Sequence, residues 1–155
     1  MSESAGMQHG TLSISREIKC PRERVFEAWT RLEHRQHWFA GPAWTAIARS
    51  LDLRVGGCEV AHGRFENGVE TVYTSRFHLI EAPARLVYVF DMQVAGAPFS
   101  VSLAGLEFEV EHGWTRLTYT EQAFFLAGDY GRDARLNGTN GLLDRFEAYV
   151  STLSR

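Results

Sequence analysis

Residues Cys20–Thr30 read CPRERVFEAWT and carry the first clear fold signal of the chain. Its proline suits the first turn of a helix, where a missing N–H costs no hydrogen bond. Apolar residues then recur at spacings of three and four, which is the period of a helix, at Val25, Phe26 and Trp29. We therefore predict a short helix over Arg22–Thr30. A second short helix is expected over Leu32–Phe39, and Gly41-Pro42 ends it.

Upstream of this stretch, Thr11–Lys19 alternates between apolar and polar residues. A period of two predicts a half-buried strand, with Leu12, Ile14 and Ile18 on the covered face. Residues 1–10 lack the basic start and the apolar centre of a signal peptide, so we expect a disordered lead-in and a cytoplasmic protein. No linker or repeat interrupts the rest, and residues 11–155 are therefore predicted to be one domain.

Downstream, a succession of strand-like runs is separated by turn residues, and its Asn67-Gly68 pair is a strong hairpin signal. The predicted strands cover Trp44–Leu53, Cys58–Phe65, Val69–Ile80, Arg85–Met92, Phe99–Glu111 and Trp114–Phe125. In the fifth of these runs, apolar Leu106, Phe108 and Val110 alternate with Glu107, Glu109 and Glu111. This pattern predicts an antiparallel sheet with one dry face and one charged face.

The end of the chain supplies a cover for the dry face. Gly141–Val150 is amphipathic, and one stripe, extended past the helix end, holds Leu142, Leu143, Phe146, Tyr149, Val150 and Leu153. Gly138 and Gly141 lower helical propensity by about 1 kcal/mol each, so we expect Asp129–Gly138 to form a loop before the helix. The prediction is an α+β fold in which a curved antiparallel sheet of about six to seven strands wraps around a long C-terminal helix.

Composition narrows the classes of function. The 155-residue chain has a net charge of −3, whereas a nucleic-acid surface usually needs a basic face. No apolar run approaches the roughly 20 residues of a membrane span. Two cysteines, Cys20 and Cys58, in a chain without a leader are expected to be reduced and structural. We therefore expect neither nucleic acid nor membrane as a partner.

Several motifs together resemble the helix-grip fold of the START-like SRPBCC superfamily, and the resemblance spans residues 11–153. It is carried by CPRERVFEAWT (20–30), Glu33-His34 with Trp38, DLRVGG (52–57), Pro83 with RLVY (85–88), TRLTYTEQ (115–122) and LLDRF (142–146). Within the superfamily, the chain is similar to the branch named after the activator of the heat-shock-protein-90 ATPase, often labelled polyketide cyclase-like in bacteria. The resemblance implies a ligand cavity between the sheet and the long helix. It carries over no catalytic residue.

Glu121 is the candidate with the sharpest chemistry. It shares strand parity with Leu117 and Tyr119, so it is expected to face the covered side, where a carboxyl group could act as general acid or base. The alternative is a structural hydrogen bond or a return to solvent at the strand end. Tyr73, His78, Tyr88 and Tyr119 are polar-tipped aromatics on central strands, which suits pocket walls. Tyr73 and His78 have opposite parity, so only one of them is expected in the cavity unless a bulge intervenes.

Further ligand contacts are expected near the C-terminal helix, from Phe125, Leu142 and Phe146, with residues 124–128 forming a loop at the pocket mouth. His34 and His37 stand three apart beside Glu33, a spacing that metal sites use. However, no third ligand is evident nearby and the HExxH pattern is absent, so we predict no metal. The chain also carries no cofactor fingerprint, and no cofactor is expected.

Three functions remain open from these residues. The first is a cytoplasmic binding protein for a small, largely apolar or aromatic ligand. The second is an enzyme of the cyclase, dehydratase or isomerase kind that uses Glu121 as acid or base. The third is a co-chaperone-type interaction protein that uses the acidic outer face of Glu107, Glu109 and Glu111. A homodimer is also considered, because Trp114 at a hairpin tip is an apolar group that a partner could cover.

Overall fold

The computed structural model describes residues 7–153. Strand β1 (Gln8–Ile18) leads into helices α1 (Arg22–Thr30) and α2 (Leu32–Trp38). Six strands follow and a long helix ends the fold: β2 (Trp44–Leu51), β3 (Cys58–Phe65), β4 (Glu70–Glu81), β5 (Arg85–Val94), β6 (Ala97–Glu111), β7 (Trp114–Phe125) and α3 (Arg132–Ser151). No helix within these residues is long and apolar enough to cross a membrane.

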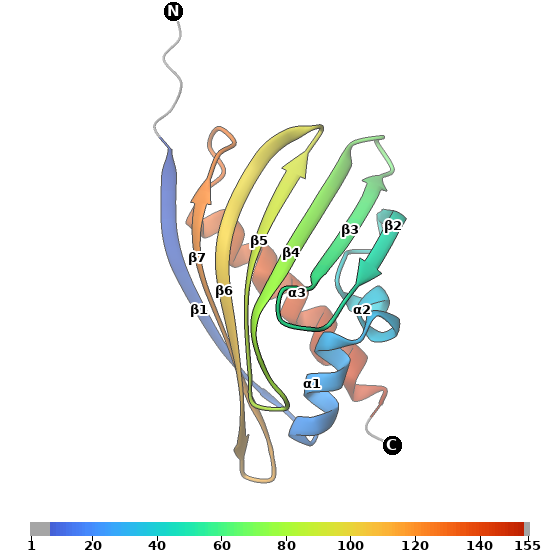
Figure 1. The fold of residues 1–155 in the computed structure, drawn as a ribbon, viewed down its shortest axis with the longest axis vertical. Coiled ribbons are helices and arrows are strands. Elements are labelled where there is room, and N and C mark those ends of the chain that lie inside the picture. The colour runs from blue at the N-terminus through green and yellow to red at the C-terminus, as the bar shows by residue number, and fades with distance from the viewer. Residues whose placement is uncertain (1–6, 154–155) are drawn as a thin grey trace, which may run out of the picture.

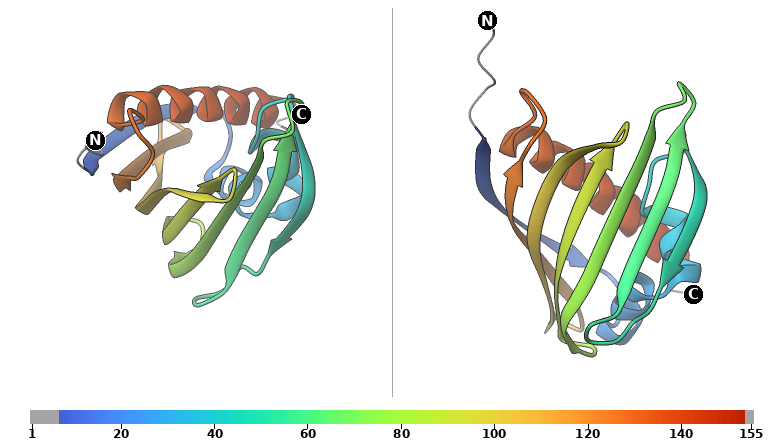
Figure 2. Two further views of the ribbon diagram at one scale, coloured as in Figure 1. Left: turned by 90° about the horizontal axis from the view of Figure 1, so that it is seen from above. Right: turned by 45° about the horizontal axis from the view of Figure 1, so that its top comes forward.

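The strands form one seven-stranded antiparallel sheet in the order β1-β7-β6-β5-β4-β3-β2, and α3 crosses behind it (Figure 1). Seen from above, the sheet curves away from α3 like a half-shell (Figure 2). Arg16 on the edge strand β1 ties the helix down, because its guanidinium donates to Asp144 and Glu147 at 2.9 Å each. The predicted helix-grip α+β fold, with two short helices after the first strand, is confirmed.

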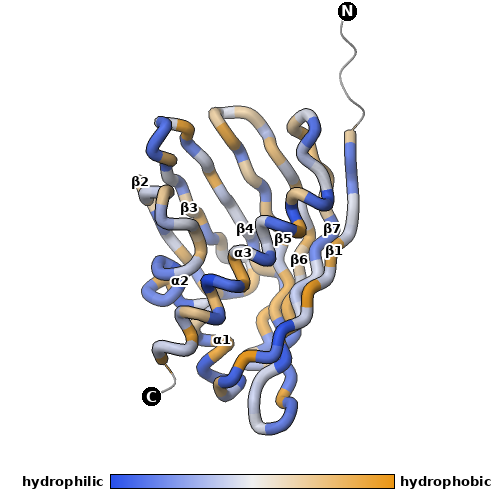
Figure 3. Tube along the Cα trace, turned by 180° about the vertical axis from the view of Figure 1, so that it is seen from behind, coloured by the Kyte–Doolittle hydropathy of each residue, from blue (hydrophilic) through white to orange (hydrophobic). Residues whose placement is uncertain are grey.

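The two faces of the sheet differ as the alternation predicts, and hydrophobic and hydrophilic residues follow one another along the strands (Figure 3). On β6, Leu106 and Phe108 are buried against the helices, and Glu107 and Glu109 are exposed. Val110 departs from the pattern and is 64% exposed. Its register partner is Thr115, one residue from the end of the β6–β7 pairing, so it lies near the tip of that hairpin. The hairpin extends past α1 (Figure 1).

The end of the half-shell next to α1 and α2 is filled by aromatic side chains. The Trp29 and Trp38 rings lie 4.7 Å apart between centroids, and Phe146 from α3 packs edge-on against both, at 5.1 and 4.8 Å. Trp38 and Phe146 are completely buried, and the Trp38 indole donates to the Ala28 carbonyl at 3.0 Å. This plug closes one end of the space between the sheet and α3.

Most predicted boundaries lie within about two residues of those in the structure, but two of them are wrong by more. Helix α3 begins at Arg132, so most of the predicted loop over Asp129–Gly138 is helical. Tertiary contacts outweigh the cost of the glycines there: Arg132 donates to the Thr11 carbonyl at 2.8 Å, and the buried Arg135 pairs with Glu121. Strand β1 already includes residues 8–10, which pair with β7, whereas the sequence predicts a disordered lead-in there. Residues 1–6 of that lead-in lie outside the described residues.

Candidate functional site

A cavity of about 550 Å³ lies between the concave face of the sheet and the middle of α3. Most of its lining is apolar or aromatic, and the polar groups in it are few. The helix contributes Gly138, Thr139 and Leu142, and the opposite wall comes from strands β3 to β7. Because the aromatic plug closes the α1 and α2 end, the cavity extends toward the β3–β4 and β5–β6 hairpins, where Phe65, Val94 and Phe99 line it.

The sheet wall of the cavity is a continuous aromatic surface. Phe39, just after α2, meets Tyr73 edge-on with ring centroids 4.9 Å apart. Tyr73 in turn lies 5.2 Å from Phe90, and Phe90 lies 6.0 Å from Tyr88. Offset and edge-on aromatic pairs of this kind are favourable beyond the area that they bury. They hold a flat apolar wall in place opposite α3.

Trp44 extends this wall from the edge strand β2. Its indole lies across Gly63 on β3 and donates to Thr71 Oγ1 on β4 at 2.8 Å. A Cβ at Gly63 would lie 2.1 Å from the Trp44 ring, so only glycine permits this close approach. The contact places the ring beside the cavity rather than on the outside of the sheet.

Glu121 and Arg135 form a buried ion pair on one side of the cavity. The carboxylate is completely buried and accepts hydrogen bonds from Arg135, from Ser102 Oγ at 2.6 Å and from the Tyr119 hydroxyl at 2.7 Å. Arg135 also donates to Ser100 Oγ at 2.5 Å. Burial works against the charge of Arg135, but Glu121 together with Tyr130 and Tyr119 outweighs it, and the pKa of the guanidinium is raised. Charge balance and dense hydrogen bonding together make this network rigid.

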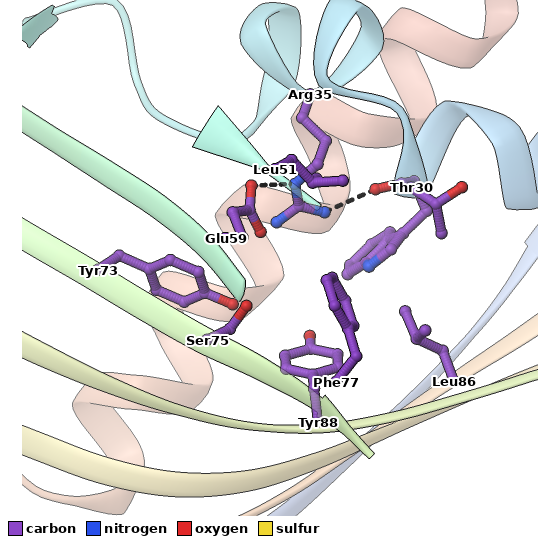
Figure 4. A pocket seen from close by; sticks show the side chains of 10 residues that line it. Thr30, Arg35, Leu51, Glu59, Tyr73, Ser75, Phe77, Leu86 and Tyr88 are labelled. Atoms are coloured by element: carbon purple, nitrogen blue, oxygen red, sulfur yellow. Dashed lines mark hydrogen bonds and ion pairs between the residues drawn. The ribbon is translucent and has the colours of Figure 1, made fainter. Parts of the chain in front are cut away.

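Arg35 and Glu59 form a second buried ion pair (Figure 4). It lies at the end of the cavity next to the aromatic plug, which is the deep end, because the Arg35 guanidinium stacks over Trp29 and Trp38. The Arg35 Nε donates to Glu59 Oε2 at 2.6 Å, and a terminal nitrogen donates to the Trp29 carbonyl at 2.6 Å. The guanidinium lies 4.6 Å from the centroid of the Phe39 ring, which is a cation–π contact. The hydroxyl ends of Tyr73 and Tyr88 point into the space beside this pair (Figure 4).

The three tyrosines of the wall stay neutral hydrogen-bond donors. Burial raises the pKa of each of the hydroxyls of Tyr73, Tyr88 and Tyr119 above the ordinary value for tyrosine. Neighbouring tyrosines or carboxylates raise these pKa values further. An uncharged phenol in an apolar wall combines ring contact with a single polar group. Such a wall can accept an apolar molecule and orient it by one or two hydrogen bonds.

The structure brings together five of the eight residues that the sequence singled out. The five that line the cavity are Tyr73, Tyr88, Tyr119, Glu121 and Leu142. Phe125 is buried beneath Arg135, with its ring 5.3 Å from the guanidinium, and so supports the ion pair. Phe146 belongs to the aromatic plug. His78 does not belong to the cavity: it is exposed, since Tyr73, Ser75 and Phe77 take the inward positions of β4.

The paired histidines of α2 pack on the C-terminal helix. His34 Nδ1 lies 2.5 Å from the Tyr149 hydroxyl, and the His37 ring stacks on Tyr149 at 5.0 Å and 8°. These contacts explain the spacing as helix-to-helix packing. Within residues 7–153, no group of three or more His, Cys, Asp or Glu side chains could hold a metal ion.

Sequence reasoning missed the arginines and Glu59. Arg135 stands on the same helical stripe as Thr139, Leu142 and Phe146, and Glu59 shares parity with the buried Ala61. A charged residue on an otherwise apolar stripe is the signal that could have found them. It becomes specific only when charges of opposite sign occur on facing elements, as Glu121 and Arg135 do, because buried charges are normally paired.

This chain matches one family model, and it resembles proteins of known structure in its fold. Residues 19–151 match the family model described as Activator of Hsp90 ATPase homolog 1-like protein. A protein of known structure from Rhizobium leguminosarum is 35% identical, with a TM-score of 0.88 over 95% of this chain and 97% of that one. A Rhizobium loti protein is 32% identical, with a TM-score of 0.84 over 94% and 99% of the two chains.

A third solved structure, of an AHSA1-like protein from Aeromonas hydrophila, is 27% identical, with a TM-score of 0.75 over 93% of this chain and 94% of that one. No curated protein matches the sequence. The similarity therefore extends over nearly the whole chain and concerns proteins whose descriptions name no ligand.

Proposed function

The chain belongs to the family of Activator of Hsp90 ATPase homolog 1-like proteins, and we propose that it is a binding protein for a small, largely apolar ligand. The observation that carries the proposal is the cavity of about 550 Å³ between the sheet and α3. Ligand pockets typically measure roughly 300–1,000 Å³ and combine apolar walls with a few polar groups. Here the aromatic wall supplies contact area, and Tyr73 and Tyr88 supply the polar groups, because the Tyr119 hydroxyl already donates to Glu121.

The hydrogen bonds that Glu121 accepts favour a role in ligand binding over a role as general acid or base. A general acid or base must exchange a proton with the substrate, and so needs an oxygen that the substrate can reach. Both oxygens of Glu121 already accept hydrogen bonds, from Tyr119 on one side and from Ser102 and Arg135 on the other. In this arrangement Glu121 balances the charge of Arg135 and fixes the cavity wall. The cyclase-like alternative would require that network to open.

The interaction-protein alternative would use the outer face of β6. Glu107 and Glu109 are exposed there, but Glu111 is engaged by Arg116, which donates to its two oxygens at 2.7 and 2.9 Å. The acidic surface is thus smaller than the sequence pattern indicates. We propose the cytoplasm as the compartment, which the two free cysteines, Cys20 and Cys58, support. The homodimer stays a prediction.

Native mass spectrometry of the protein purified without detergent tests the proposal. We expect a one-to-one adduct of a small molecule that is released on denaturation and that extraction into organic solvent identifies as largely apolar. Variants with Glu107→Gln and Glu109→Gln should carry the same adduct, because the outer face is not involved. A bare chain mass, together with a melting temperature that ignores a panel of apolar compounds, would contradict the proposal.

A further inference from the structure

A groove adjoins the cavity where α2 ends and the edge strand β2 begins, and its volume is about 550 Å³. It shares Ala40, Gly41, Trp44 and Arg145 with the cavity wall, so the two spaces meet at these residues. The groove is more polar than the cavity, and Arg49 and Arg145 both line it. A ligand in the cavity could therefore place one end beside two guanidinium groups.

Arg49 is a buried cation with an incomplete set of partners. Its side chain is only 8% exposed, and its contact with Glu59 Oε2 is long, at 3.4 Å. The same oxygen already accepts the 2.6 Å bond from Arg35. The Nε of Arg49 is buried and has no hydrogen-bond partner within the described part of the chain. A buried donor left unpaired is costly, and an acceptor bound in the groove would satisfy it.

Arg145, on α3, also lines the groove, and among the residues that the structure describes its guanidinium likewise has no carboxylate of its own. It donates to the carbonyls of Trp38, at 3.1 Å, and Phe39, at 3.5 Å. No carboxylate of residues 7–153 lies within ion-pair distance of it. Burial lowers the pKa of both Arg49 and Arg145, and the nearby carboxylates only partly oppose this. Arg35 and Arg135 differ, because close carboxylates raise their pKa despite burial.

The charges around the two spaces do not balance. Four arginines line them or the adjoining deep end, Arg35, Arg49, Arg135 and Arg145. Among the described residues that line these spaces, the carboxylates are Glu59 and Glu121, and each is already engaged by a closer guanidinium. Asp144 acts on Arg145 only from beyond ion-pair distance, and it does not restore the pKa that burial lowers. Two positive charges therefore remain on the groove side. Partly desolvated cations of this kind favour an anionic partner, and guanidinium groups bind carboxylates especially well.

We propose that the ligand is an amphiphilic acid, whose apolar body lies against the aromatic wall and whose carboxylate or similar anionic group binds Arg49 and Arg145 in the groove. This inference rests on the proposed function and names its ligand class. The distribution of polar groups supports it: hydroxyls and paired charges surround the cavity, and the uncompensated charge is concentrated at one mouth.

A matched pair of probes tests the inference, namely 2-naphthylacetic acid and its uncharged amide, measured by isothermal titration calorimetry at neutral pH. The wild-type protein should bind the acid about tenfold or more tightly than the amide, which corresponds to one hydrogen-bonded charge pair. Arg145→Gln should remove that preference by weakening the acid about tenfold, and it should leave the amide within about twofold. Arg76→Gln, an equal charge change on the exposed face of β4, should change neither affinity.

A second variant, Arg49→Gln, should reproduce the loss of preference. Arg145 is only partly buried and bonds only to backbone carbonyls, so Arg145→Gln is expected to fold even where Arg49→Gln does not. Equal affinities for acid and amide in the wild-type protein would overturn the inference and leave the proposed function standing. The same holds if the preference survives in Arg145→Gln. An absence of saturable binding for both probes would contradict the inference and the proposed function together.

Discussion

At the level of single residues, two buried ion pairs connect the helices to the inner face of the sheet. Glu121 and Arg135 come from β7 and α3, and Arg35 and Glu59 come from α2 and β3. Each pair therefore joins a helix to the sheet. Buried pairs contribute little net stability compared with apolar residues of the same shape, but breaking one is strongly destabilising. Their value here lies in fixing where the helices sit over the sheet.

Glu121→Gln should lower the free energy of unfolding by about 3–5 kcal/mol, because it leaves the buried Arg135 without a counter-charge. Urea unfolding measures this change. The double variant Glu121→Gln/Arg135→Met should lose less than the sum of the single changes, since it removes both charges. As a control, Glu107→Gln on the exposed face should stay within about 0.5 kcal/mol of the wild type. A loss below about 1 kcal/mol in Glu121→Gln would contradict the buried pair.

The buried tyrosines predict how stability depends on alkaline pH. Because burial raises the pKa of Tyr73, Tyr88 and Tyr119 above the ordinary value of 10.0, the unfolded chain loses these protons first as pH rises. The folded state then binds more protons than the unfolded state, so stability is retained below pH 10 and falls above it. Each tyrosine should contribute a slope of about 1.4 kcal/mol per pH unit there.

Urea unfolding at a series of pH values checks this slope. Tyr88→Phe removes one of the three titrating groups, so its stability should fall less steeply above pH 10 than that of the wild type. A wild-type profile that stays flat to about pH 11 would show that these phenols ionise as easily in the folded state as in the unfolded one.

At the scale of elements, the close approach of β2 and β3 shapes the cavity wall. Gly63→Ala would bring a Cβ within 2.1 Å of the Trp44 ring and 2.7 Å of the Thr45 carbonyl. The indole must then leave its place and lose the 2.8 Å bond to Thr71. We expect stability to fall by about 1–3 kcal/mol, as for other overpacked sites, and the indole fluorescence to shift toward that of exposed tryptophan.

Gly138→Ala on α3 is the matched control for this substitution. A Cβ there meets no atom within 4 Å, so the change should stabilise the protein by about 0.5–1 kcal/mol through helix propensity alone. Equal effects of Gly63→Ala and Gly138→Ala, measured by urea unfolding, would contradict the role given to Gly63.

Some helix and strand boundaries can be predicted from sequence patterns alone, and others cannot. Cys58–Phe65 and Trp114–Phe125 are predicted to the residue, because strand parity and turn residues are local signals. The start of α3 is not predicted correctly, because Gly138 and Gly141 lower the local helix propensity. The helix forms there because Arg132 and Arg135 bind partners that are distant in the sequence. For the same reason Glu121 could be placed on the covered face, but its pairing with Arg135 and the exposure of His78 needed the three-dimensional arrangement.

At the scale of the whole molecule, the fold is a half-shell with one closed end. The tryptophan and phenylalanine plug fills the end at α1 and α2, and the aromatic wall and α3 leave space at the other. Paired charges hold the walls together, and two uncompensated guanidinium groups mark one side of the mouth. This combination of rigidity and open volume is what a protein that binds small molecules requires.

A fluorescence titration with N-phenyl-1-naphthylamine, an uncharged apolar probe, tests whether the space between the sheet and α3 binds a ligand. The wild-type protein should bind it saturably with one-to-one stoichiometry. Leu142→Trp enlarges a partly buried side chain that lines the cavity and should abolish the binding, whereas Asn137→Trp, at an exposed position of α3, should leave it intact. Binding that both variants retain equally, or no saturable binding by the wild type, would contradict a ligand cavity between the sheet and α3.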